Sequence, residues 1–521
     1  MCFISILDEN SRFRRIKMKI REYSATLEEK MSEFDMWVTP SLGEIRDTPQ
    51  FQKNLTELQF GFDYISQFAN GFNQLSGCTP KNLATNVLQY INEQPEENAL
   101  KILDAVCNVL LLASGKTDNN LKCQYPLMLK NQFGIEKYPQ GKSQKMKPVP
   151  RVFSINDVTK VIVGLKGKDE YQREFAESYF HLIISDEGYA KQLWSLGNAY
   201  VCQKKKGCER ELISSMTIFQ SRGSITATQG HIPETILREY MKEWGLKENE
   251  DFNTSDVEVG EILDGVEVDS KLKKRKYDFI VPFKSKKDGA KVFVQSQFYA
   301  GDSGSVSHKV VDQTDSTRTA TLKKYPDAVF LEYLDGAGYF ASLNGDLRKM
   351  LAKPTTKDFM QIRTAPIKLR RELQKVEFLT PLEIEHAILR TDGENKSVRA
   401  LLRADGYSEE EVNRAISMMT ENEMLVATND GRYEVHPSRI NTVRKYCVLD
   451  VIANYGKPIA VDKKEGCLFV AGFENMHGLQ LSEVSKKVME TFRGGCTIWK
   501  SVQDAFDDVQ WLIDNKFVIM K

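Results

Sequence analysis

Apolar and polar residues alternate with a period of two in two short stretches near the middle of the chain. Residues 277–283 and 291–299 are rich in β-forming residues, and the turn-forming run SKKDG separates them, so a β-hairpin is predicted. The pattern that follows predicts a serine-capped helix reaching about Tyr325 and then a short apolar strand at 328–334. Strand, strand, helix and strand in this order indicate an α/β unit.

Helical periodicity dominates the part of the chain before this unit. Residues 49–75, 80–115 and 154–200 have apolar positions spaced as on one face of a helix. The Lys- and Pro-containing run at 138–151 is expected to be a mobile basic linker. Residues 213–230 are rich in β-forming and hydroxyl side chains, and we expect strands there.

The last third of the chain has the pattern of small helical modules. KLRRELQKVEFLTPLEIEHAILR (368–390) predicts an amphipathic helix, and a later helix begins at Ser408 with a Ser-x-x-Glu capping box. Two short strands around Asn429-Asp430-Gly431 would form a wing, which completes a winged-helix plan. A helix that runs into a strand near the C-terminus partly repeats it. Three glutamates at 409–411 leave open whether these modules bind DNA or protein.

These patterns predict a multidomain α+β protein. The predicted segments are a helical N-terminal domain (1–150), a helical and β segment (151–220), a central α/β domain (221–352) and two winged-helix-like domains (377–440 and 441–521). Residues 353–376 are expected to form a protease-sensitive junction.

Polar side chains in the central domain lie where they could act together. Asp278 opens the first strand, and Gln295 and Gln297 lie two apart in the second, so both point to one face of the sheet. Lys309 lies in the first turn of the helix after the hairpin. One acid and two polar groups would therefore converge at the end of a small sheet.

Residues 220–345 resemble the catalytic core of the PD-(D/E)xK nucleases, which include most restriction endonucleases, in the order of these elements and in the polar residues just named. The resemblance implies a mixed sheet, bound Mg²⁺ and hydrolysis of DNA. In that family the first Asp and the acid of the (D/E)xK pair hold the metal, and the Lys orients or activates the attacking water. In this chain Gln295 stands at the acid position, Gln297 stands at the Lys position, and Lys309 is expected to contact phosphate.

A glutamine at the acid position removes a charge from a site that must hold a dication. Because Mg²⁺ is usually bound through one or two carboxylates, a second acid is expected from elsewhere. Glu234, at the start of the helix in GHIPETILREYMKEWGL, is the first candidate, because related nucleases often carry an acid on the helix before the sheet. Asp302, in the loop after the second strand, is the alternative.

Cationic residues near the proposed site are candidates for contact with DNA. Lys273, Lys274 and Arg275 immediately precede the first strand and would counter the charge of a phosphodiester substrate. Arg222 lies in a hydroxyl-rich stretch almost free of acids, and His308 lies beside a helix start. Protection of an edge strand by lysines explains part of the same pattern.

The composition of the chain limits the possible classes of protein but indicates no functional site. The chain has 521 residues, which is too long for one core, and its 72 basic and 72 acidic residues cancel, so nucleic-acid binding must rest on local patches. We find no apolar run of the ~18 residues that a membrane span needs, and no secretory signal pattern. Nine scattered cysteines indicate reduced thiols in a cytoplasmic protein.

The function that the resemblance implies is that of a type II restriction endonuclease acting on double-stranded DNA with Mg²⁺ as cofactor. The long flanks resemble those of enzymes that cut to one side of an asymmetric site. A homodimer or larger homo-oligomer is expected, with a cognate methyltransferase as genetic partner. Two alternatives stay open: a phage-defence or repair nuclease of the same fold, and a winged-helix DNA-binding regulator whose central domain is an inactive nuclease.

Overall fold

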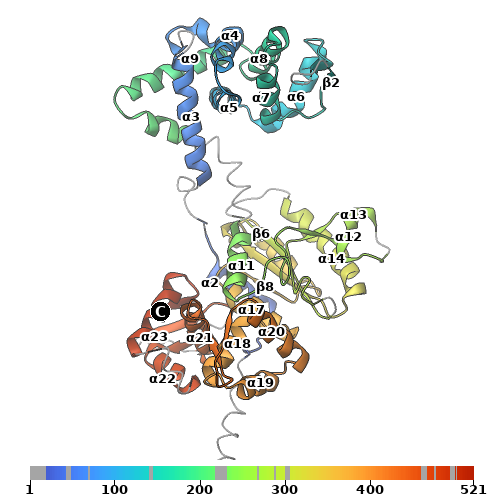
Figure 1. The fold of residues 1–521 in the computed structure, drawn as a ribbon, viewed down its shortest axis with the longest axis vertical. Helices are drawn as coiled ribbons and strands as arrows, with labels where there is room; N and C mark the ends of the chain where they lie inside the picture. The colour runs from blue at the N-terminus through green and yellow to red at the C-terminus, as the bar shows by residue number, and fades with distance from the viewer. Residues whose placement is uncertain are drawn as a thin grey trace, which may run out of the picture. The chain divides into compact units, whose positions relative to one another are not determined.

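The computed structural model divides the chain into two compact units, a helical unit of residues 43–228 and a larger α+β unit of residues 1–42 and 229–521. Figure 1 shows both. The structure describes residues 19–40, 42, 49–67, 71–139, 145–217, 232–266, 269–286, 289–299, 306–458, 466–473, 477–492, 499 and 501–520. The predicted multidomain α+β class is confirmed.

The helical unit packs around α5 (Glu96–Ser114), an apolar helix that the sequence predicts. Around it lie α3 (Pro49–Gln67), η2 (Gly71–Asn73), η3 (Leu75–Cys78), α4 (Pro80–Asn92), α6 (Asp118–Asn131), α7 (Ile155–Gly164), α8 (Asp169–Ile183) and α9 (Glu187–Lys204). A Cβ at Gly61 of α3 would lie 2.3 Å from the carbonyl oxygen of Ala105 in α5. Only glycine therefore lets these two helices approach so closely.

Residues 138–151 do not form the linker that we expected. β1 (Lys137–Pro139) and β2 (Met146–Pro148) pair as an antiparallel hairpin. Phe153 and Val158, just after the hairpin, lie in the same hydrophobic core as the residues of α5. The predicted boundary at residue 150 therefore does not coincide with an end of the compact helical unit, because one hydrophobic core extends across residue 150.

The end of the helical unit also differs from the expectation. Residues 213–217, which we expected to be β, are helical, and the Thr217 hydroxyl donates to the Ile213 carbonyl as in a continuing helix. Residues 218–231 lie outside the described residues. The rest of the predicted β stretch, including Arg222, is therefore not tested.

The larger unit contains a four-stranded mixed sheet with the strand order β5-β6-β7-β8. The strands are β5 (Phe279–Val281), β6 (Val292–Phe298), β7 (Val329–Asp335) and β8 (Asp358–Met360). β5 is antiparallel to β6, whereas β6, β7 and β8 are mutually parallel. The helix α14 (Val306–Lys324) makes the crossover from β6 to β7, as a parallel pair requires. The strands and this helix agree closely with the predicted order.

Helices cover the two faces of this sheet (Figure 1). On one face, Val292 and Val294 share a core with Leu237 of α11 (Ile232–Glu243). On the other face, Phe293 shares a core with Ala320 of α14. Successive residues of β6 thus point into different cores. This alternation explains the period of two in the sequence.

Shorter elements complete this part of the unit. β3 (Val257–Glu258) pairs with β4 (Lys276–Tyr277) in a separate antiparallel pair. The remaining short helices are α12 (Val259–Ile262), α13 (Ser270–Lys273), α15 (Ala337–Phe340) and α16 (Asn344–Leu351).

Residues 353–376 are not the exposed junction that we expected. They include β8 and the helix α17 (Ala365–Lys375), in which every residue from Ala365 to Gln374 is buried. The single helix expected over 368–390 is also wrong, since α17 ends at Lys375 and α18 (Pro381–Arg390) begins after a turn in which Glu377 has φ 55°. A buried helix of this kind cannot serve as a protease-sensitive linker.

The C-terminal part follows the expected succession of helices and a hairpin. α18, α19 (Asn395–Ala404) and α20 (Glu409–Glu421) precede the antiparallel pair β9 (Leu425–Ala427) and β10 (Tyr433–Val435). Ser408 caps α20 by accepting from the Glu411 N–H, but the Glu411 side chain accepts from Leu379 N–H at 2.8 Å rather than completing a capping box.

The last part of the chain has its own sheet. The helix α21 (Ile440–Tyr455) packs with α22 (Leu481–Thr491), α23 (Val502–Asp514) and a four-stranded sheet. The strands, in spatial order, are β11 (Lys457–Pro458), β13 (His477–Gln480), β12 (Cys467–Val470) and β14 (Val518–Met520). One hydrophobic core joins this region with α18–α20 and with the central sheet. The domains predicted at 221–352, 377–440 and 441–521 therefore share a core, and the winged-helix assignment stays a prediction.

The described N-terminal segment binds across the larger unit. Residues 20–26 are extended, and the helix α2 (Leu27–Trp37) follows with a Thr26–Glu29 capping box. The N–H of Ile20 donates to Gln374 Oε1 at 2.8 Å, and the N–H of Thr39 donates to Asp335 Oδ1 at 2.7 Å. Of the helical character expected for the N-terminal domain, this segment shows only α2 within the described residues.

Among the helices that the structure describes, none combines the length and the apolar character needed to cross a bilayer.

Candidate active site at a fork between two strands

Two strands of the mixed sheet separate at Asp278 and form a fork. β5 pairs with β6 over only three residues, Phe279–Val281 against Val292–Val294. Beyond Val294, β6 continues beside β7, while the chain before Asp278 turns away as β4 to pair with β3. Polar groups from both strands meet where they separate, since the Asp278 carboxylate accepts from the Ser296 N–H.

Main-chain and side-chain hydrogen bonds fix Asp278 in this fork. Its N–H donates to the Val294 carbonyl at 3.2 Å, and its Oδ2 accepts from the Ser296 N–H at 2.7 Å. Its own carbonyl accepts from the Asn253 side-chain amide at 2.7 Å, and Asn253 Oδ1 accepts from the Ile280 N–H at 2.7 Å. The Ser296 N–H, which a neighbouring strand could otherwise bind, thus donates to the Asp278 carboxylate. This contact interrupts the hydrogen-bond ladder and holds the carboxylate at the fork.

Glu234 lies in the first turn of α11, and its negative charge acts on Asp278. Its side chain is buried, with 7% of the residue exposed, and it pairs with Arg238 at 3.4 Å. The start of α11 is held against β7, because Tyr333 Oη donates to the Pro233 carbonyl at 3.1 Å. The Arg238 guanidinium also lies 5.1 Å from the centre of the Phe279 ring.

The two acids interact electrostatically. Burial raises the pKa of Asp278 to about 7, the Ser296 N–H opposes that rise, and the negative charges of Glu234 and Asp256 add to it. A neighbouring negative charge disfavours the ionised form of a carboxyl group. Glu234, the residue chosen from the sequence as the partner of Asp278, thus contributes to the electrostatic environment of Asp278, and its role as second metal ligand stays a prediction.

Gln295 lies on β6 in register with Glu332 of β7. Its Oε1 accepts from Arg318 Nη2 at 3.1 Å, and the same nitrogen donates to Glu332 Oε1 at 2.6 Å. Arg318 comes from α14 and also donates to Thr356 Oγ1 at 2.7 Å through Nη1. Gln295 is thus part of a buried polar cluster between two strands and a helix.

Gln297 has a different partner. Its Oε1 accepts from Tyr339 Oη of α15 at 2.5 Å. Before α15 the chain turns at Gly336, where φ is 107° and a Cβ would lie 2.3 Å from the Tyr299 carbonyl oxygen, so glycine is required. The two glutamines share a strand as predicted, but separate elements hold them.

The other predicted residues are placed only in part. Lys273 ends α13, and Lys274 and Arg275 follow it, all exposed. His308 and Lys309 lie in the first turn of α14, and their side chains are outside the described residues. Asp302 and Arg222 lie outside them altogether.

Four residues of the site were missed from the sequence: Asn253, Arg318, Glu332 and Tyr339. Glu332 could have been found, because it is the one acid within the otherwise apolar run VFLEYL. Arg318 and Asn253 carry no comparable local signal, since they act through residues distant in the chain.

The carboxylates of Asp278 and Glu234 are of the chemical type that Mg²⁺ accepts as ligands. Mg²⁺ takes oxygen ligands and usually needs only one or two carboxylates, because waters fill its remaining positions. Asp278 and Glu234 offer two carboxylates whose mutual repulsion a dication would relieve. Within the described residues no group of three acidic, histidine or cysteine side chains surrounds one point, so such an ion would rely on these two.

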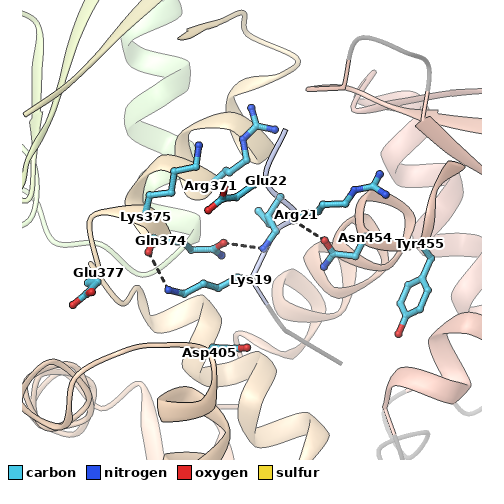
Figure 2. A pocket seen from close by; sticks show the side chains of 11 residues that line it. Lys19, Arg21, Glu22, Arg371, Gln374, Lys375, Glu377, Asp405, Asn454 and Tyr455 are labelled. Atoms are coloured by element: carbon cyan, nitrogen blue, oxygen red, sulfur yellow. Dashed lines mark hydrogen bonds between the residues drawn. The ribbon is translucent and has the colours of Figure 1, made fainter. Parts of the chain in front are cut away.

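A cavity lies where residues 19–22 pass α17. This cavity of about 720 Å³ is shown in Figure 2. Lys19 Nζ donates to the Gln374 carbonyl at 3.2 Å, and the Arg21 N–H donates to Asn454 Oδ1 at 2.9 Å. The lining mixes cations such as Lys375 with acids such as Glu377, so it favours no single class of ligand.

No family model, curated protein or solved structure was found to match the chain.

Proposed function

We propose that this protein is a Mg²⁺-dependent endonuclease that hydrolyses phosphodiester bonds in double-stranded DNA, of the type II restriction kind. The observation that carries the proposal is the placement of Asp278 at the fork, where the Ser296 N–H holds its carboxylate, burial raises its pKa to about 7 and the charge of Glu234 adds to that rise. Strongly shifted pKa values of this origin are typical of functional sites.

The residues of the fork would divide the chemistry between them. Asp278 and Glu234 would hold Mg²⁺, which supplies, when bound, an activated water and stabilisation of the charge that develops on phosphate. The Ser296 N–H keeps the Asp278 carboxylate in place. Gln297 occupies the position of the family's lysine, and Lys309 would contact phosphate.

The surroundings of the fork suit a polyanion. Lys273, Lys274 and Arg275 are exposed in the segment that leads into β4, and electrostatic attraction to DNA phosphates would bring the duplex toward Asp278. The C-terminal modules would supply target recognition or dimerisation. We expect a homodimer or larger homo-oligomer and a cognate methyltransferase as genetic partner.

The test is incubation of the wild-type chain with phage DNA and Mg²⁺, followed by mapping of the cut ends. We expect discrete DNA fragments in the presence of Mg²⁺ and no fragments in the presence of EDTA. Asp278→Ala should lower cleavage by at least about 10³-fold, the size of effect seen when a main electrostatic contributor is lost. DNA binding should persist, because Asp278 is not a base contact.

A matched control is Asp256→Ala. Asp256 is an exposed acid that also raises the pKa of Asp278 and pairs with Lys276 at 3.6 Å. Its loss should leave cleavage within a few-fold of wild type. Near-wild-type cleavage by Asp278→Ala would show that the fork takes no part in the reaction.

A DNA-binding regulator with an inactive nuclease domain is the second candidate function. Gln295 at the acid position favours it, as does the lack of a third metal-binding side chain near the fork within the described residues. Sequence-specific DNA binding without cleavage in either Mg²⁺ or Mn²⁺ would support this reading. A phage-defence or repair nuclease would instead cleave DNA without a neighbouring methyltransferase gene.

A further inference from the structure

Arg318 is a buried cation that the proposed chemistry does not use directly. It is 1% exposed, and its guanidinium lies 5.2 Å from the centre of the Phe330 ring. Its Nη1 donates to Thr356, and its Nη2 donates to both Glu332 and Gln295. Contacts from β6, from β7 and from the loop before β8 therefore fix its orientation.

The bond to Arg318 determines how the Gln295 amide is turned. Arginine carries only donors, so the atom of Gln295 that lies 3.1 Å from Nη2 must be the carbonyl oxygen. The amide nitrogen of Gln295 then faces elsewhere, and it makes no hydrogen bond to any residue in the described part of the chain. Gln295 is only partly buried, and it adjoins Ser296, whose N–H holds Asp278.

The neighbouring strand explains why this position carries an amide rather than an acid. Glu332 is in register with Gln295, and adjacent strands lie about 4.8 Å apart. A carboxylate at position 295 would share one guanidinium with Glu332 and repel it in a buried setting. Arg318 and Glu332 already neutralise each other, at 2.6 Å and with 1% of each side chain exposed.

We propose that Gln295 is a hydrogen-bond donor to the scissile phosphate, held in that orientation by Arg318 and Glu332, and that it is not a metal ligand. The proposal rests on the proposed nuclease function and deepens it. A neutral N–H donor suits a phosphate oxygen, whereas a metal would need the oxygen that Arg318 occupies. Arg318 and Glu332 are then positioning residues.

Gln295→Glu separates the two roles of Gln295, because it keeps an oxygen and removes the donor. As a lost phosphate donor, it should lower the single-turnover cleavage rate at least about tenfold. The Mg²⁺ concentration for half-maximal cleavage should not fall. The Mg²⁺-induced rise in the melting temperature, measured without DNA, should not increase.

The matched control is Gln52→Glu in the helical unit. Gln52 is exposed, and its Oε1 also accepts from an arginine, Arg210 Nη2 at 2.7 Å. The same substitution there should change neither the cleavage rate nor the response to Mg²⁺. A common effect of both variants would point to general charge rather than to the site.

The positioning role needs a variant that folds. Arg318→Met with Glu332→Leu removes both buried charges together, which proteins often tolerate, whereas removing one would leave the other unpaired. The double variant should cleave at least about fivefold more slowly while its half-maximal Mg²⁺ concentration stays unchanged. Wild-type cleavage by a folded double variant would overturn the positioning role.

Two outcomes separate this inference from the proposed function. A Gln295→Glu variant that binds Mg²⁺ more tightly and cleaves as fast as wild type would make Gln295 a metal ligand and overturn only this inference. A wild-type protein that cleaves no DNA and gains no stability from Mg²⁺ would reject the proposed function, and the inference with it.

Discussion

The larger unit buries charge in two regions, and the two are built in opposite ways. Around α17 each buried cation faces carboxylates, as Arg370 does with Glu383 at 2.9 Å and with Asp450 at 2.7 Å. At the fork the negative charge of Glu234 acts on Asp278, and Arg238 pairs with Glu234. The first arrangement satisfies its charges, whereas the second leaves a surplus of negative charge.

The pKa values reflect this contrast. Burial alone would raise the pKa of Asp450, but Arg370 and His386 outweigh it and lower that pKa to about 2. Burial also acts on Asp278, and there Glu234 adds to it, so the pKa rises to about 7. Matched charge is what a structural interior requires, while a surplus of one sign is what a site for an opposite charge requires.

The largest expected effect concerns the stability of the α17 region. Arg370→Met would leave Asp450 and Glu383 buried without their cation and should lower the free energy of unfolding by about 3–5 kcal/mol. Chemical denaturation near pH 7 measures it. Arg348 is a matched control, because it also binds one carboxylate through both terminal nitrogens, Glu28 at 2.6 and 2.8 Å, but on the surface. Arg348→Met should cost much less, because exposed ion pairs are screened by solvent. Equal losses of unfolding free energy in the two variants would mean that burial does not make the ion pairs of Arg370 more important than that of Arg348.

The next effect concerns the second acid of the fork. Glu234→Gln keeps the shape of the side chain and removes its charge, and it should cost about 2 kcal/mol of transition-state stabilisation, roughly 30-fold in single-turnover rate. High Mg²⁺ or Mn²⁺ should recover part of the loss. Glu239→Gln, an exposed position on the same helix, is the control. If Glu234→Gln is silent and Asp302→Asn is not, Asp302 is the missing acid.

A further effect, of similar size, is a gain in stability at the fork. Between about pH 4 and pH 7 folded Asp278 retains a proton that the unfolded chain releases, so the free energy of unfolding falls as the pH rises through this window. Asp278→Asn removes that dependence and should be more stable than wild type by roughly 1–3 kcal/mol at pH 8 without metal. Denaturation at pH 4 and pH 8 measures it, and equal pH dependence in both proteins would contradict a buried, charge-strained Asp278.

Local patterns predicted much of the central fold. The alternation along β6 and the capped helix before β7 gave the strands and α14, and the apolar stripe after Pro233 gave α11 and so the placement of Glu234. These features depend on neighbours in the chain, which a single sequence contains.

Other features depend on residues far apart and were not predicted. α17 has charged residues at Lys368, Arg370 and Arg371, so its sequence resembles an exposed helix, and only partners such as Asp358 and Asp450 make its burial possible. The role of Arg318 likewise depends on the register of β6 with β7. The hairpin β1–β2 was missed because lysines and prolines weaken its strand pattern.

The central claim is that the surplus negative charge at the fork binds a divalent cation. The most direct measurement is the melting temperature at pH 8 as a function of Mg²⁺ concentration, without DNA, for wild type and Asp278→Asn. We predict that Mg²⁺ raises the melting temperature of wild type in a saturable manner, because a ligand that binds only the folded state stabilises it. Asp278→Asn should start more stable and should not respond. An equal response of both proteins to Mg²⁺ would contradict the account.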